Sequence, residues 1–242
     1  MFYLILGFAP GIYWLLYFIR KDKLRPEPQK LLIKAYFLGI LTALLVIIIQ
    51  LPLKLNYLLG AVIIAPVLEE SAKYLAVRIG LFSNPAFDEP VDGIIYAAAV
   101  ALGFASLENV IYLYRVSEVS RQLLSNVVLI RSLLSVPGHA LFSGFWGHAL
   151  GKVKFLPSDK KKGIILTGLI LAIISHALFN FLCFVEIYSS AGLLLLIALL
   201  WAALQKNIST ALQEESRMRL QIVRRINTNI RSIINWKRKL HA

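Results

Sequence analysis

Long uninterrupted apolar stretches constrain this chain more than any other feature of its sequence. Several of them approach the roughly 20 residues that a helix needs to cross the hydrocarbon core of a bilayer. Of the 242 residues, 58% are hydrophobic and 16% are charged, whereas a soluble domain has about 25% charged residues. The sequence therefore predicts an all-α polytopic transmembrane helix bundle with about seven spans, at 2–19, 33–51, 57–80, 92–114, 133–151, 163–186 and 190–204.

Basic residues outside the predicted spans indicate the orientation. They gather between the first two spans, between the fifth and sixth spans, and in the C-terminal segment. The positive-inside rule places such segments in the cytoplasm. Even numbers of spans separate the three regions, so we expect the N-terminus outside and the C-terminus inside a multi-pass protein of the cell membrane. The residues in the two loops are Arg20, Lys21, Lys23, Arg25, Lys30, Lys152, Lys154, Lys160, Lys161 and Lys162.

The pattern predicts two regions: a transmembrane domain at 1–204, whose motif-bearing core is about 57–186, and a basic cytoplasmic tail at 205–242. Apolar and basic residues alternate in the tail at helical spacing, which favours an amphipathic helix on the anionic inner leaflet. A solvated basic tail is the alternative. The net charge of +13 is divided among short segments, so we expect no nucleic-acid partner. The tail residues concerned are Ile222, Val223, Ile226, Ile230, Ile233, Ile234, Arg224, Arg225, Arg231, Lys237, Arg238 and Lys239.

The third predicted span carries three charged residues about midway along its length: Glu69, Glu70 and Lys73. A charge at the bilayer centre costs at least about 2.5–3.5 kcal/mol, so each one needs a reason. Glu69 and Lys73 share a helix face and can pair, whereas Glu70 points about 100° away. Two adjacent carboxyls in a low dielectric cannot both ionise easily, and a carboxyl that retains its proton suits acid–base catalysis. The alternative is a purely structural ion pair.

Three further spans carry polar residues at comparable depth. Glu108 and Asn109 lie in the fourth span, His139 in the fifth, and His176 with Asn180 in the sixth. With the topology above, Glu69, Glu108, His139 and His176 all fall between the midplane and the outer side, so we expect them to meet in one cavity. The alternatives are that Glu108 reaches the interface and that the histidines are packing residues.

The fifth span contains an interruption, Pro137-Gly138, directly before His139. Either a helix starts at Pro137 or a longer helix kinks there. Irregular backbone at membrane depth is tolerated only where protein or a water cavity can satisfy it. Both alternatives therefore place His139 beside an irregularity that faces the protein interior.

These motifs resemble those of the PrsW-type intramembrane protease family. The resemblance covers about residues 60–185 and rests on four motifs in order, each within a predicted span. That family is similar to the wider group of CAAX-processing and bacteriocin-immunity glutamic membrane proteases, in which a histidine stands at the position of Glu108. The motifs are Glu69-Glu70-x-x-Lys73, Asp92-Gly-Ile-Ile-Tyr96 with Gly103-Phe104-x-x-x-Glu108-Asn109, Pro137-Gly138-His139-Ala-Leu-Phe-Ser-Gly144, and His176-Ala-Leu-Phe-Asn180.

The resemblance implies an intramembrane endopeptidase that cuts a membrane-anchored, single-span substrate of the anti-sigma-factor type. From the residue types, we expect Glu69 to act as base on a water held between it and Glu108, with His139 or His176 donating to the oxyanion. Glu70 is expected to belong to the catalytic set with these residues and, together with Lys73, to set the charge state and orientation of Glu69. Lys73, Asn109 and Asn180 are expected to support the catalytic residues.

Three alternatives remain on the sequence alone. We prefer a site without a cofactor, and a Zn²⁺ ion on Glu69, His139 and His176 is the alternative within the enzyme class. From other classes, a proton-coupled transporter or channel, or a non-catalytic membrane scaffold, also uses polar residues in spans. We see no internal repeat of the kind many transporters carry, which favours the peptidase.

Overall fold

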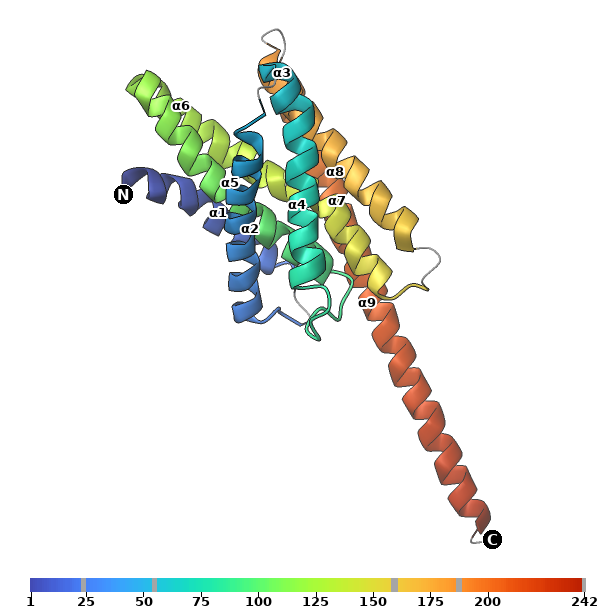
Figure 1. The fold of residues 1–242 in the computed structure, drawn as a ribbon. Helices are drawn as coiled ribbons and strands as arrows, with labels where there is room; N and C mark the ends of the chain where they lie inside the picture. The colour runs from blue at the N-terminus through green and yellow to red at the C-terminus, as the bar shows by residue number, and fades with distance from the viewer. Residues whose placement is uncertain (23–24, 54–55, 158–160, 186–188, 241–242) are drawn as a thin grey trace.

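The computed structural model consists of helices and connecting segments (Figure 1). It describes residues 1–22, 25–53, 56–157, 161–185 and 189–240, the last nine of these by their backbone alone. The side chains of Tyr57 and Ser189 also lie outside the description. The helices are α1 (Phe2–Ile19), α2 (Gln29–Gln50), α3 (Tyr57–Leu59), α4 (Ala65–Gly80), α5 (Asp92–Val119), α6 (Arg121–Ile130), α7 (Val136–Lys154), α8 (Lys161–Phe184) and α9 (Ser189–Leu240).

The predicted membrane helix bundle is confirmed. Within the described residues, six helices are long and apolar enough to cross a membrane. The run 57–80, predicted as the third span, is helical as well, but it carries Glu69, Glu70, Lys73 and Arg78 and is not among the six. The chain is thus a multi-pass integral membrane protein, while the number of spans and the orientation of the termini stay predictions.

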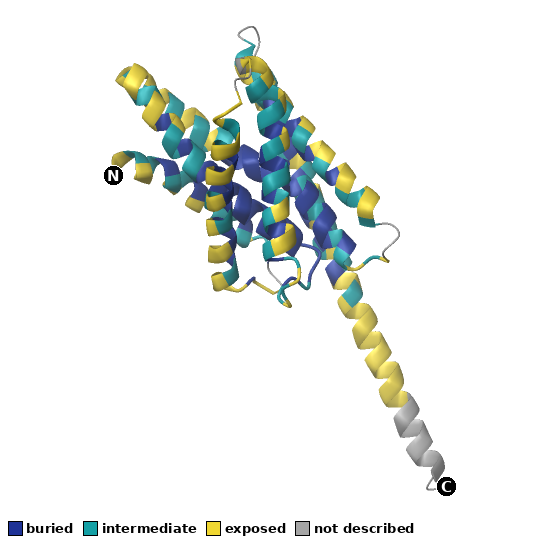
Figure 2. Cartoon of the chain, in the orientation of Figure 1, coloured by how far each residue is buried: buried dark blue, intermediate teal, exposed yellow. Residues whose placement is uncertain are grey.

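Helix α5 forms the centre of the bundle. It packs against α1, α2 and α7, and every residue from Asp92 to Ser106 is buried. Small residues permit this close packing, since a Cβ on Gly39 of α2 would lie 2.0 Å from the carbonyl oxygen of Val100, and one on Gly103 would lie 2.0 Å from that of Tyr36. Figure 2 shows the buried residues at the middle of the bundle, with exposed residues along the outer helices. Exposed apolar side chains on those outer faces are those expected to meet lipid.

Two π-helical turns join pairs of helices into longer runs. Gly60–Ile64 connects α3 to α4, and Arg131–Ser135 connects α6 to α7. Of the two alternatives for Pro137, the structure therefore has the longer helix, which begins at Arg121 and carries an irregularity just before the proline. The predicted limits 92–114 and 133–151 were too short, because α5 reaches Val119 and the next helix starts two residues later.

The last predicted span and the tail form one helix. Helix α9 continues from Ser189 to Leu240 without a break and projects away from the bundle (Figures 1 and 2). Ile222, Val223, Ile226 and Ile230 are exposed on it. Binding of this segment to anionic lipid stays a prediction, and the side chains of Ile233, Ile234, Lys237, Arg238 and Lys239 lie outside the described residues, as do Lys23 and Lys160 in the loops.

Candidate active site

A π-helical turn precedes each of α4 and α7, two of the helices that bring polar groups to the centre of the bundle. Each turn ends two residues before a proline, Pro66 in α4 and Pro137 in α7. A proline lacks an N–H and its ring crowds the preceding helical turn, and a π-helical turn absorbs that disturbance. Glu69 follows Pro66 by three residues and His139 follows Pro137 by two. Such insertions occur frequently at functional sites.

Glu70 is the most completely bonded carboxylate of the site. Its side chain is 0% exposed. Oε1 accepts from Lys73 Nζ at 2.6 Å and lies 3.1 Å from His176 Nδ1, while Oε2 accepts from Ser143 Oγ at 2.7 Å and Trp146 Nε1 at 3.0 Å. Because the carboxylate can only accept, His176 carries its proton on Nδ1 and leaves Nε2 as an acceptor. Glu70 thus fixes the orientation of His176.

Lys73 supplies a buried positive charge among these groups. Its Nζ lies 2.6 Å from Glu70 Oε1 but 3.9 Å from Glu69 Oε2, so the pair expected between Glu69 and Lys73 is the longer one. Nζ also donates to His139 Nδ1 at 3.2 Å and lies 4.5 Å from the centre of the Phe104 ring. The ammonium of Lys73 therefore makes its short contacts with Glu70 and His139, and its electrostatic attraction to Glu69 is weaker because the distance is longer.

Glu69 differs from its neighbour in having an oxygen without a donor. The residue is 6% exposed, and its Oε2 is buried with no hydrogen-bond partner among the described residues. His176 Nε2 and Lys73 Nζ each lie 3.9 Å from that oxygen, which is beyond hydrogen-bonding distance. A buried carboxylate oxygen left in this way costs free energy, and a proton, a water or an ion bound to it would reduce that cost.

Glu108 stands opposite Glu69 in a different setting. Its side chain is 35% exposed, and its Oε2 accepts from Arg131 Nη2 at 2.8 Å and from His139 Nε2 at 3.1 Å. Arg131 Nε donates in turn to Asn109 Oδ1 at 2.7 Å. His139 therefore accepts at Nδ1 and donates at Nε2, which makes it a neutral imidazole between Lys73 and Glu108.

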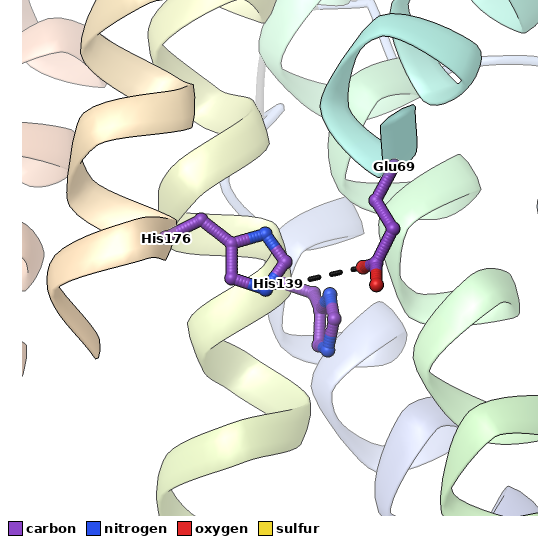
Figure 3. A group of neighbouring side chains, drawn as sticks. All are labelled: Glu69, His139 and His176. Carbon is purple, nitrogen blue, oxygen red and sulfur yellow. Dashed lines mark ion pairs between the residues drawn. The ribbon is translucent and has the colours of Figure 1, made fainter. Parts of the chain in front are cut away.

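Glu69, His139 and His176 form one group (Figure 3). Each is buried and each offers a ligand atom within 4.8 Å of the others. They come from α4, α7 and α8, and the dashed line in Figure 3 joins Glu69 to His176. The aromatic ring of Phe142 stacks on His176 with 4.7 Å between centroids. The four groups expected to converge therefore meet, since Glu108 contacts His139 directly.

The donor set of this group fits a zinc ion. Two histidine nitrogens and one carboxylate oxygen are the ligands of many catalytic zinc sites, with the fourth position left for water. The bond from His176 Nδ1 to Glu70 is the carboxylate support that metal-bound histidines have in such sites. However, both nitrogens of His139 already have partners in Lys73 and Glu108.

Two cavities meet at the carboxylates. One of about 410 Å³ lies among α2, α4 and α5, and one of about 630 Å³ lies toward the π-helical turns and α8. Both are lined by Gln50, Glu69, Glu108 and Tyr112. The same pair of glutamates thus lines both cavities.

The supporting residues divide into those expected and those missed. Asn180 has no hydrogen bond to a histidine among the described residues; its Nδ2 donates to the carbonyl of Ala61 in the first π-helical turn at 2.8 Å. Its supporting role stays a prediction. Arg131, Ser143, Trp146 and Phe142 were not predicted as site residues. Arg131 carried one usable signal, an arginine at the start of an apolar run. Phe142 and Ser143 lie within the motif that begins at Pro137, whereas Trp146 looks like an ordinary packing residue in sequence.

The comparisons with known proteins agree with these motifs. Residues 27–205 match the family described as PrsW family intramembrane metalloprotease. A protein named Protease PrsW from Geobacillus kaustophilus (strain HTA426) is 35% identical over 209 residues, which cover 83% of this chain and 88% of that protein. Proteins of the same name from Bacillus subtilis (strain 168) and Clostridioides difficile (strain 630) are 32% and 31% identical, covering 73% and 79% of this chain and 80% and 82% of theirs. No solved structure gives a significant match.

Proposed function

The chain belongs to the PrsW family of intramembrane proteases, and from this premise we propose that it cuts a single-span membrane protein of the anti-sigma-factor type with a water activated by Glu69. The observation that carries the proposal is the contrast between two neighbouring carboxylates. Glu70 is saturated with donors, whereas Glu69, which lines two cavities, has a buried oxygen without a donor among the described residues.

Glu69 is the proton acceptor in this mechanism. A water between Glu69 and Glu108 would give a proton to Glu69 Oε2 while its oxygen attacks the scissile carbonyl carbon. When the C–N bond breaks, Glu69 returns that proton to the leaving amine, and the new carboxyl stays on the other fragment. Glu108 suits the other end of the water because Arg131 and His139 hold its carboxylate in place.

The histidines are placed to stabilise the tetrahedral intermediate. His139 donates at Nε2 and Lys73 lies behind its Nδ1, so a shift of that N–H from Glu108 to the oxyanion needs no change of tautomer. Removal of one such donor typically costs about 100- to 1,000-fold in kcat. His176 lines the same space, and Glu70 holds its ring in place.

The charges of the described site residues favour the version without an ion. Three carboxylates, Glu69, Glu70 and Glu108, face two permanent cations, Lys73 and Arg131. One proton balances that excess negative charge, whereas a divalent ion would exceed it. A zinc ion, if held by Glu69, His139 and His176, would polarise the carbonyl and acidify a bound water. Glu108 would then be the carboxylate left to accept a proton.

Cleavage by the reconstituted protein tests the function. Candidate single-span proteins would be incorporated into liposomes with the wild type, Glu69→Gln, His176→Ala or Glu118→Gln, which changes an exposed glutamate at the end of α5. We expect Glu118→Gln to cleave normally and Glu69→Gln to lose at least about 100-fold in rate, the usual minimum for a general base. Cleavage persisting unchanged in both Glu69→Gln and His176→Ala would remove the proposed site.

Metal content distinguishes the two versions of the site independently of activity. Elemental analysis of the purified wild type should give no stoichiometric zinc, and a chelator should leave cleavage unchanged. One zinc per chain in the wild type, lost in both Glu69→Gln and His176→Ala, would instead assign the ion to these residues.

A further inference from the structure

A second group of buried carboxylates lies at the other end of the bundle from the π-helical turns. Asp22 and Glu27 belong to the segment between α1 and α2, and Asp92 is the first residue of α5. They are 4%, 6% and 0% exposed, and each offers an oxygen within 4.8 Å of the others. In Figure 1 the α1–α2 and α4–α5 segments come together at the lower end of the bundle, and the ion pair between Arg25 and Asp88 at 2.5 Å joins them.

Asp92 has one oxygen fixed by the backbone and one without a donor. Its Oδ2 accepts from the backbone N–H groups of Asp88 at 2.8 Å and Glu89 at 2.6 Å. Its Oδ1 is buried and has no hydrogen-bond partner among the described residues. Glu27 is held beside it, because Tyr96 donates its hydroxyl to Glu27 Oε2. The backbone and Tyr96 thus hold two carboxylates together although their charges repel each other.

The described basic residues nearby bind other acids. Arg25 pairs with Asp88 and lies 3.9 Å from Glu89, and Arg219 of α9 pairs with Glu89 at 2.6 Å. In the part of the chain that the structure describes, no lysine or arginine nitrogen lies within 4.0 Å of a carboxylate oxygen of Glu27 or Asp92. Burial raises the pKa of Glu27 above its ordinary value, and the negative charge of Asp22 raises it further.

We propose that Asp22, Glu27 and Asp92 bind a hard divalent cation, of the Ca²⁺ or Mg²⁺ class, that fastens the α1–α2 segment to the start of α5. An all-oxygen carboxylate set selects such ions over zinc, which takes nitrogen and sulfur ligands readily. The ion would lie against Asp92 Oδ1 and offset the negative charge of Glu27 and Asp92, to which no described lysine or arginine forms an ion pair. It is separate in position and chemistry from the group of Glu69, His139 and His176.

The role assigned to this ion is structural. Asp92 begins the central helix, and Glu108 lies 16 residues further along it (108 − 92), which is about 24 Å of helix rise. An ion at the first residue would fix that helix against the loop that precedes α2. This proposal does not depend on the proposed peptidase mechanism, because binding and unfolding are measured without substrate.

Ion binding to the full-length protein in detergent micelles tests the proposal. After treatment with a chelator, the wild type would be titrated with CaCl₂ and with MgCl₂ by calorimetry, and its thermal unfolding followed with and without each salt. We expect one ion per chain, and a midpoint raised by about 5–10 °C at a cation concentration about 100-fold above Kd. Asp92→Asn and Glu27→Gln should each lose the binding and the shift.

Asp88→Asn is the matched control, since it removes a neighbouring acid that is 38% exposed and already paired with Arg25. It should keep the bound ion. If Asp92→Asn fails to fold, Glu27→Gln and the wild-type titration still decide. Absence of a bound ion in the wild type, or equal binding by Glu27→Gln, would overturn the proposal and leave a proton shared between Glu27 and Asp92 as the explanation.

Discussion

The two adjacent glutamates of α4 have opposite surroundings. Glu70 accepts from four side chains that come from α4, α7 and α8, and one of them is the buried ammonium of Lys73. Glu69 has an oxygen with no donor among the described residues. The same turn of α4 therefore carries Glu70, whose carboxylate links three helices, and Glu69, whose carboxylate lacks a donor among the described residues and lines both cavities.

This contrast predicts opposite effects of the same substitution. Glu70→Gln should destabilise the protein by about 3–5 kcal/mol, because it leaves Lys73 buried without its nearest negative charge. Glu69→Gln should change the stability by less than about 1 kcal/mol, because it breaks no short contact, yet abolish cleavage. Thermal unfolding in detergent, measured together with cleavage, checks both, and equal destabilisation by the two substitutions would contradict the assignment.

A second prediction at the residue scale concerns the role of Arg131 in positioning Glu108. Its guanidinium binds Glu108 and Asn109 through different nitrogens, which a lysine cannot reproduce because it presents one compact charge. We expect Arg131→Lys to lower cleavage about 10- to 100-fold, the usual cost of losing a positioning contact. Arg121→Lys, at the exposed start of α6, is the control. A normal rate for Arg131→Lys would show that Glu108 needs no such support.

At the scale of the elements, the helices pack through close approach of their backbones to one another as well as through their side chains. Helices α2 and α5 meet at Gly39 and Gly103, where backbone carbonyls occupy the space of a Cβ. Helix α7 meets α5 in the same way, since a Cβ on Gly147 would lie 2.5 Å from that of Ala97. The approach of α7 to α5 bears on the distance between Glu108 and His139, because these residues lie on those two helices.

Alanine at one of these glycines should lower the stability of the whole bundle. In Gly103→Ala the new Cβ would meet the backbone of Tyr36, which cannot move aside as a side chain end can, so we expect a loss of about 1–3 kcal/mol. The midpoint of thermal unfolding would fall by about 2–4 °C for each kcal/mol. Gly163→Ala is the matched control in α8, because nothing lies within 4 Å of its Cβ position. If both variants unfold at the same temperature, the close approach does not limit packing.

At the scale of the whole molecule, the two cavities join the site to its surroundings. The larger one is lined by Cys183, which is exposed and is the chain's single cysteine. A group attached to its sulfur would lie in the same cavity as Glu69, Glu108 and Arg131. If an extended substrate passes through this cavity, the bound substrate should hinder chemical modification of the Cys183 thiol.

Thiol modification therefore tests the path of the substrate. We expect a bulky maleimide to slow cleavage by the wild type at least about 10-fold, the effect of misplacing a substrate by a fraction of an ångström or more. Cys183→Ser should be active and insensitive to the reagent, and added substrate should slow modification of the wild type. Full activity after complete modification would exclude this cavity as the path.

The sequence was sufficient to predict the helix bundle and the meeting of Glu69, Glu108, His139 and His176, because burying charge in lipid needs partners at the same depth. It could not predict that Lys73 pairs more closely with Glu70, since helical spacing permits both glutamates. Nor could it show that Arg131 reaches Glu108 and Asn109, because those partners lie 23 and 22 residues away on another helix. The group of Asp22, Glu27 and Asp92 escaped notice because Asp22 and Glu27 lie in the segment before α2, whereas Asp92 begins α5, 65 residues after Glu27 (92 − 27).

The isotopic composition of the cleavage products tests the central claim most directly. The reconstituted protein would cleave its substrate in H₂¹⁸O, and mass spectrometry would locate the label. The account predicts one ¹⁸O in the new C-terminal carboxylate with the wild type, and no labelled product above background with a folded Glu69→Gln variant. Labelled product formed by Glu69→Gln at the wild-type rate would contradict it.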